Sequence, residues 1–121
     1  MNIKKVLILE DDLFLVKVIQ KKFEKSGHIV SILLDGLKAV ETAKSFKPDI
    51  ILIDLIMPEK DGFTAISELK GDPETANIPI IVASNLSFEE DINKARNLGI
   101  IKYFVKSNVD LSGVISYIDS L

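Results

Sequence analysis

Residues 48–62 read PDIILIDLIMPEKDG, and this stretch decides the fold. It begins with an uninterrupted apolar run of strand type at residues 50–53, which is followed at once by the carboxylate of Asp54. The chain then stays apolar through residues 55–57 until Pro58 interrupts it, which argues against a helix cap or a turn as the role of Asp54. Because charged groups are rarely buried without a partner or a task, we interpret Asp54 as a chemical residue.

Composition narrows the class of protein. The 121 residues fit one domain that spans residues 1–121. The absence of cysteine excludes disulfides, thiol catalysis and cysteine-ligated metals, and a net charge of −3 argues against direct binding to nucleic acid. No apolar run is long enough to span a bilayer, so we expect a cytoplasmic location and no membrane partner. The single histidine, His28, has no second ligand or nucleophile nearby in sequence, and we predict that it lies on the surface at the start of a strand.

Strand-like and helix-like patterns alternate along the chain. Short aliphatic runs predict strands at residues 6–9, 29–34, 50–53, 78–83 and 101–105. Apolar residues spaced three and four apart predict a helix after each strand, and Ser87 with Glu90 predicts a capping box for the fourth helix. Parallel strands need helical returns, and each helix must bury its apolar stripe. The sequence therefore predicts a doubly wound α/β fold with a five-stranded parallel sheet and five helices.

Polar residues follow four of the five predicted strands. Asp11 and Asp12 come after the first strand, Asp54 ends the third, Ser84 follows the fourth and Lys106 follows the fifth. Functional groups of parallel α/β sheets collect beyond the carboxyl ends of the strands, so we expect these five side chains to converge. Each has an ordinary structural explanation when taken singly, such as a helix cap, a turn or a solvated charge. The set as a whole favours a functional site.

The chemistry of this set points to phosphoryl transfer. Three crowded carboxylates repel one another and require a cation. Because every candidate ligand is an oxygen, the set favours Mg²⁺ with several retained waters over Zn²⁺ or a caged Ca²⁺. Beside such a cation Asp54 can attack phosphorus, while the cation, the Lys106 ammonium and the Ser84 hydroxyl each take one oxygen of the transferred group. The predicted product is an aspartyl phosphate.

Four pieces of the sequence resemble the receiver domain of response regulators in two-component signalling, including the chemotaxis regulators. They are EDD at 10–12, DLIMP at 54–58 with DG at 61–62, PIIVAS at 79–84 and YFVK at 103–106. The resemblance covers the whole chain and implies a flavodoxin-like sheet of strand order 2-1-3-4-5. It also implies a phosphoprotein that acts as a phosphorelay switch, without turnover of an external substrate. The phosphodonor would be a phosphohistidine of a sensor histidine kinase or of a histidine phosphotransfer protein.

The resemblance assigns metal and acceptor roles residue by residue. It makes Asp54 the phosphoacceptor and one of the magnesium ligands. Asp12 would bind the metal directly and Asp11 through a water molecule. The backbone carbonyl of Ile56 would be the third protein ligand.

The resemblance also assigns the parts of the switch. Ser84 matches the hydroxyl that moves toward the phosphoryl group, and Lys106 matches the lysine that pairs with it. Tyr103 matches the aromatic residue that changes rotamer when the hydroxyl moves. The output surface would be the fourth helix, fifth strand and fifth helix, at residues 87–121, which would bind a partner or a second copy of the chain.

Several positions depart from the common family pattern. Ser107 stands where a proline usually follows Lys106, so this peptide is either trans with a reshaped loop or cis at a cost of ~3 kcal/mol. Asn85 replaces a small residue beside the switch hydroxyl. These two changes motivate the alternative of a receiver-like protein-interaction module that does not use phosphorylation. Ile56 and Leu86 are apolar and cannot orient water, so we predict slow self-dephosphorylation.

Two further classes fit the sequence less well. An aspartate-nucleophile phosphatase would carry a second carboxylate two positions after the nucleophile, where Ile56 stands. A flavodoxin-type flavin binder would place its phosphate loop after the first strand, and that position is acidic here. The switch is therefore the leading hypothesis.

Overall fold

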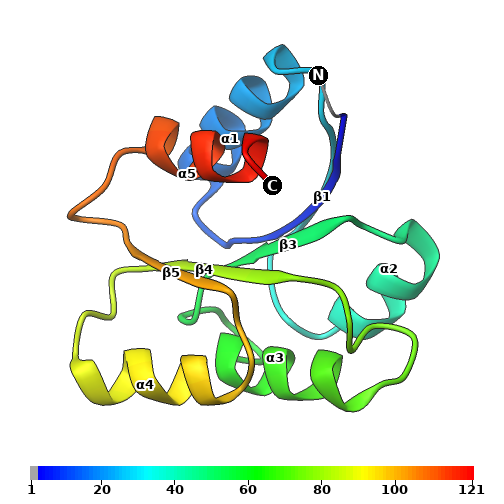
Figure 1. The fold of residues 1–121 in the computed structure, drawn as a ribbon, viewed down its shortest axis with the longest axis vertical. Coiled ribbons are helices and arrows are strands. Elements are labelled where there is room, and N and C mark those ends of the chain that lie inside the picture. The colour runs from blue at the N-terminus through cyan, green and yellow to red at the C-terminus, as the bar shows by residue number, and fades with distance from the viewer. Residues whose placement is uncertain (1–2) are drawn as a thin grey trace.

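The computed structural model describes residues 3–121, which form five strands that alternate with five helices (Figure 1). The strands are β1 Lys5–Leu9, β2 Ile29–Leu33, β3 Ile50–Ile53, β4 Ile80–Ser84 and β5 Lys102–Val105. The helices are α1 Leu13–Lys25, α2 Ala39–Phe46, α3 Gly62–Gly71, α4 Glu89–Asn97 and α5 Leu111–Asp119. Every predicted element is present, with boundaries shifted by one or two residues at the strands. Within residues 3–121, no helix combines the length and apolar character that a bilayer crossing needs.

All strand pairs are parallel, and the strand order is β2-β1-β3-β4-β5. The doubly wound fold and the order 2-1-3-4-5 are therefore confirmed. In Figure 1, α1 and α5 cover one face of the sheet, whereas α2, α3 and α4 cover the other. The chain moves outward from β1 to β2 and then returns past β1 to β3, so the strand order reverses between β1 and β3. Ligand sites of such sheets form at the carboxyl ends of the strands beside this reversal.

The core consists of two apolar layers, one on each face of the sheet. Along β1, Val6 and Ile8 pack into the layer under α1 and α5, and Leu7 and Leu9 pack into the layer under α2 and α3. All four residues of β3 are buried, as expected for a central parallel strand. Each fully buried aliphatic side chain contributes about 1.5–3 kcal/mol of transfer free energy. The two layers thereby fix the carboxyl ends of the central strands, where the polar residues are.

Three helices begin at an aspartate whose side chain caps the first turn. Asp12 accepts hydrogen bonds from Phe14 N at 3.0 Å and Leu15 N at 3.2 Å, and Asp61 and Asp110 cap α3 and α5 in the same way. For α4 the predicted capping box was wrong, because this helix begins after Phe88 without a side-chain cap. Its first turn instead carries three acidic residues, which interact favourably with the positive end of the helix dipole.

His28 is buried, with 5% of its surface exposed, so the prediction of a surface histidine was wrong. Its Nδ1 accepts a hydrogen bond from Lys4 N at 3.0 Å, and its Nε2 lies 2.5 Å from Asp119 Oδ1. Its ring also packs against Phe23 at the end of α1. Lys4 directly precedes β1, Phe23 and Asp119 belong to α1 and α5, and Asp119 lies 91 positions away in sequence. No local pattern around His28 could have revealed them.

Candidate functional site

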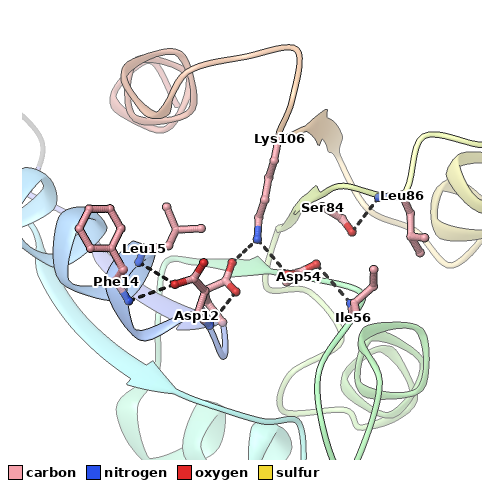
Figure 2. Close-up of polar contacts among 9 residues, drawn as sticks. Asp12, Phe14, Leu15, Asp54, Ile56, Ser84, Leu86 and Lys106 are labelled. Atoms are coloured by element: carbon pink, nitrogen blue, oxygen red, sulfur yellow. Dashed lines mark hydrogen bonds and ion pairs between the residues drawn. The ribbon is translucent and has the colours of Figure 1, made fainter.

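Asp54 lies directly after β3, with 7% of its surface exposed (Figure 2). Its backbone N–H donates to Leu9 O at 3.0 Å, which ties the end of β3 to β1. Its Oδ1 accepts from Ile56 N at 3.2 Å, and its Oδ2 pairs with Lys106 Nζ at 2.8 Å. The two carboxylate oxygens therefore have different partners, one a backbone amide and the other an ammonium group.

Lys106 extends from the end of β5 across the carboxyl edge of the sheet, as Figure 2 shows. Its backbone N–H donates to Ser84 O at 2.9 Å, which fixes the point from which the side chain leaves the strand. Its Nζ binds both Asp54 and Glu10. Burial lowers the pKa of Lys106, but the hydrogen bonds and charges of the two carboxylates outweigh it, so the pKa lies above its usual value. Lys106 therefore bridges two acidic residues.

Glu10 is a member of the site that sequence reasoning missed. Only 3% of its surface is exposed. Burial raises the pKa of Glu10, the negative charge of Asp54 adds to this, and the bond from Lys106 opposes it. The register offers the missing signal: Leu9 pairs with Ile53, so the residues that follow them, Glu10 and Asp54, lie side by side at the sheet edge.

Carboxylate oxygens of Glu10, Asp11 and Asp54 lie within 4.8 Å of one another. This trio is the only such metal-competent group found within the described residues 3–121, and it does not include Asp12. Asp12 instead caps α1, the structural alternative that the sequence left open. The structure thus brings Asp11 and Asp54 together as expected, with Glu10 in the place expected for Asp12. The chain turns into α1 at Asp12, so the side chain of Asp12 belongs to the helix.

The trio fits a hard divalent cation. Its donors are all carboxylate oxygens, the ligands that Mg²⁺ prefers. Three carboxylates face the single ammonium of Lys106, so the group keeps an excess of negative charge. The side chain of Ile56 is exposed, and its backbone N–H contacts Asp54. The metal role of the Ile56 carbonyl stays a prediction.

Ser84 and Tyr103 meet at the backbone of one residue, Leu86. Ser84 is fully buried at the end of β4, and its Oγ accepts from Leu86 N at 3.3 Å. The Tyr103 hydroxyl donates to Leu86 O at 2.6 Å. Burial raises the pKa of Tyr103, which keeps the hydroxyl a hydrogen-bond donor. The predicted switch hydroxyl and the predicted switch aromatic are therefore joined through one peptide segment.

Two backbone features shape the loops around the site. A Cβ atom at Gly62 would lie 2.4 Å from Asp54 O, so only glycine lets α3 begin this close to the acceptor residue. None of the peptide bonds in residues 3–121 is cis, and the Lys106–Ser107 peptide is trans. After it, Asn108 N donates to Val105 O at 2.9 Å and closes a turn that leads into α5.

The family model of the response regulator receiver domain matches residues 6–117. Together with the fold and the acidic edge, this match shows that the chain belongs to the receiver-domain family of two-component response regulators.

Two curated relatives illustrate this membership. The polar-differentiation response regulator DivK of Brucella anthropi is 32% identical over 103 residues, which cover 85% of this chain and 84% of DivK. The DNA-binding dual master transcriptional regulator RpaA of Synechocystis is 31% identical over 102 residues, which cover 84% of this chain and 42% of RpaA. The chain thus spans less than half of RpaA, and the activity of such a longer protein is not carried over to it.

Two solved structures are similar over most of the chain. The phosphorylated cyanobacterial phytochrome response regulator RcpA has a TM-score of 0.81 at 30% identity, with 98% of this chain and 91% of RcpA covered. The receiver domain of the Pseudomonas aeruginosa sensor histidine kinase PA1611, with a magnesium ion coordinated in its active-site cleft, has a TM-score of 0.78 at 27% identity. That match covers 87% of this chain and 86% of the other.

Proposed function

We propose that this chain is a phosphorylation-controlled signalling switch in which Asp54 accepts a phosphoryl group from a phosphohistidine of a partner protein. The observation that carries the proposal is the bridge that Lys106 Nζ makes to Asp54, at 2.8 Å, and to Glu10. It places a fixed cation beside a buried carboxylate at the edge where ligand sites of this fold form. The partner would be a sensor histidine kinase or a histidine phosphotransfer protein.

In the proposed reaction a carboxylate oxygen of Asp54 forms a bond to phosphorus. The phosphorus–nitrogen bond of the donor imidazole breaks, and its electron pair remains on nitrogen. The Lys106 ammonium, now 2.8 Å from Asp54 Oδ2, would donate to one phosphoryl oxygen. The buried Ser84 hydroxyl would donate to another. No external substrate is turned over, because the acceptor is the protein itself.

Glu10, Asp11 and Asp54 would hold Mg²⁺, with the Ile56 carbonyl as a further ligand. The support is the all-oxygen donor set within 4.8 Å and the magnesium ion named for the PA1611 receiver domain. When bound, Mg²⁺ would supply positive charge that neutralises the transferred phosphoryl oxygens. Without it, three carboxylates would repel an incoming phosphoryl group.

The signal would leave the site through Leu86. Ser84 Oγ now accepts a hydrogen bond from Leu86 N at 3.3 Å. If Ser84 Oγ turns toward a phosphoryl oxygen, this hydrogen bond breaks. The carbonyl oxygen of Leu86 accepts a hydrogen bond from the Tyr103 hydroxyl at 2.6 Å. A shift of this segment would therefore change the position of the Tyr103 side chain on β5. The surface of residues 87–121 would then favour a different partner or a second copy of the chain.

The first test is labelling by acetyl phosphate in the presence of Mg²⁺. The wild-type protein is expected to take one phosphoryl group, and the Asp54→Asn variant none, because the amide is not a nucleophile. Asp61→Asn is the matched control: Asp61 lies in the following loop and caps α3, a role that asparagine also fills. Labelling of Asp54→Asn at the wild-type level would contradict the assignment of Asp54.

The second test concerns the lifetime of the phosphorylated state. Ile56 N donates to Asp54, but the side chains of Ile56 and Leu86 carry no polar group that can orient an attacking water. We expect slow loss of the phosphoryl group from the purified protein in Mg²⁺, and faster loss in an Ile56→Asn variant. Equal rates in the two proteins would contradict this explanation of the lifetime.

A further inference from the structure

A cavity of about 170 Å³ lies between the sheet and the helices α1 and α5, directly behind the acidic edge. Its floor includes Ile8, Leu52 and Ala83, from β1, β3 and β4. Its roof includes Leu15 of α1 and Val114 of α5. Nothing in the proposed phosphoryl transfer uses this space.

The cavity has a specific origin in the side chains of β4. Ile81 and Ala83 point to the same face of the sheet, because side chains alternate along a strand. Ile81 fills its part of the layer, whereas Ala83, two positions nearer the carboxyl edge, offers only a methyl group. The space beside Ala83 lies beneath Leu15 of α1 and Val114 of α5.

Glu10, Asp54 and Lys106 line the end of the cavity that reaches the site, and Lys106 is already bonded to both carboxylates. Asp110, which caps α5, also lines the cavity. The remaining floor and roof are aliphatic. Most of the cavity lining is therefore apolar.

We propose that this cavity is a binding site for one small uncharged apolar molecule of the size of benzene. An engineered apolar cavity of about 150 Å³ binds benzene or xenon, so a volume of about 170 Å³ admits a single six-membered ring. The excess of carboxylates at the polar end disfavours an anionic ligand. An occupant would lie against the methylene stem of Lys106, the residue that clamps Asp54.

The test is a benzene titration of the metal-free wild-type protein followed by methyl NMR. We expect saturable shifts of the methyl groups of Leu15, Ala83 and Val114, and ring-to-protein contacts with the methylenes of Lys106. The methyl groups of Leu7 and Leu69, in the opposite layer, are expected to stay unchanged. Shifts that grow without saturation, or that spread over both layers, would overturn the proposal.

Two variants at one position locate the site. Ala83→Ile adds volume inside the cavity and is expected to weaken benzene binding at least tenfold without lowering the thermal midpoint. Ala83→Ser preserves the volume and is expected to retain binding within twofold or threefold. Undiminished binding in a folded Ala83→Ile variant would overturn the assignment, and the wild-type titration decides alone if that variant does not fold.

A charged probe tests the class of ligand. Benzoate has the same ring and one negative charge, and the carboxylates at the polar end are expected to repel it. We expect at least tenfold weaker binding than for benzene. Benzoate binding as tight as that of benzene would contradict the apolar assignment. None of these measurements uses Mg²⁺ or phosphorylation, so they can fail or succeed independently of the proposed switch.

Discussion

Two polar clusters lie at opposite edges of the same sheet, and both join β1 to the C-terminal part of the chain. The carboxyl-edge cluster consists of Glu10, Asp11, Asp54 and Lys106. The amino-edge cluster consists of the Lys4 backbone amide, the His28 ring and the Asp119 carboxylate: His28 accepts from the Lys4 amide through Nδ1 and donates to Asp119 through Nε2.

The two clusters differ in their charge balance. In the amino-edge cluster each ring nitrogen of His28 has one partner, so its bonding capacity is fully used inside the protein. The carboxyl-edge cluster has three carboxylates and one ammonium, which binds Glu10 and Asp54, so negative charge and lone pairs are left for a ligand. A cluster of charged groups whose hydrogen-bonding capacity is partly unused indicates a binding site. A buried polar group whose hydrogen bonds are all made inside the protein indicates a structural role. The comparison predicts opposite outcomes for mutations at the two edges.

The largest expected effect on stability is at the amino edge. His28→Ala removes a buried ring and leaves the Lys4 amide without its acceptor, so we expect the free energy of unfolding to fall by about 3 kcal/mol. Urea denaturation measures this loss. The Mg²⁺ affinity of the folded fraction should stay at the wild-type value. A loss below about 1 kcal/mol would mean that His28 does not have this structural role.

Magnesium should stabilise the protein through the carboxyl edge. A ligand that binds only the folded state adds about 2.7 kcal/mol to the free energy of unfolding at a concentration of 100 times its Kd. We expect this gain in thermal or urea unfolding with Mg²⁺, and its complete loss with a chelator. The same gain in Asp54→Asn would place the ion elsewhere.

Glu10→Gln separates ligand binding from stability. The amide keeps the shape of Glu10 and can still accept from Lys106, but it removes one of three crowded charges. We expect Mg²⁺ affinity to fall at least tenfold, about 1.4 kcal/mol, while the stability of the metal-free protein stays equal or rises. Calorimetric titration measures the Mg²⁺ affinity, and urea denaturation measures the stability of the metal-free protein. Unchanged affinity would remove Glu10 from the metal site.

Asp12 provides the smallest and most discriminating effects. Asp12→Ala loses the cap of α1 and is expected to cost about 1 kcal/mol of stability. Asp12→Asn keeps the cap, because asparagine is also a good N-cap residue, and should change both stability and Mg²⁺ affinity very little. A large loss of Mg²⁺ affinity in Asp12→Asn would restore Asp12 as a metal ligand and contradict its role as a cap.

The fold could be predicted from the sequence because its signals are local. Aliphatic runs such as residues 50–53 and helical spacings such as Phe63, Ile66 and Leu69 identify elements without knowledge of their partners. Asp54 and Lys106 directly follow their strands and Ser84 ends its own, so the topology alone brings them to one edge.

The remaining features depend on contacts that a local pattern does not contain. Three consecutive acids follow β1, and choosing between Glu10 and Asp12 requires knowing which residue turns the chain into α1. His28 is buried by partners that include Asp119, 91 positions away. The cavity beside Ala83 depends on how two helices pack over the sheet. None of these has a signature within one segment.

The most direct test of the central claim is the position of the phosphoryl group. The protein is incubated with acetyl phosphate and Mg²⁺, reduced with borohydride, which converts an aspartyl phosphate to homoserine, and digested for tandem mass spectrometry. The account predicts homoserine at position 54 in the wild-type protein and none in the absence of acetyl phosphate. Homoserine at position 11 or 12, or at no position, would contradict it.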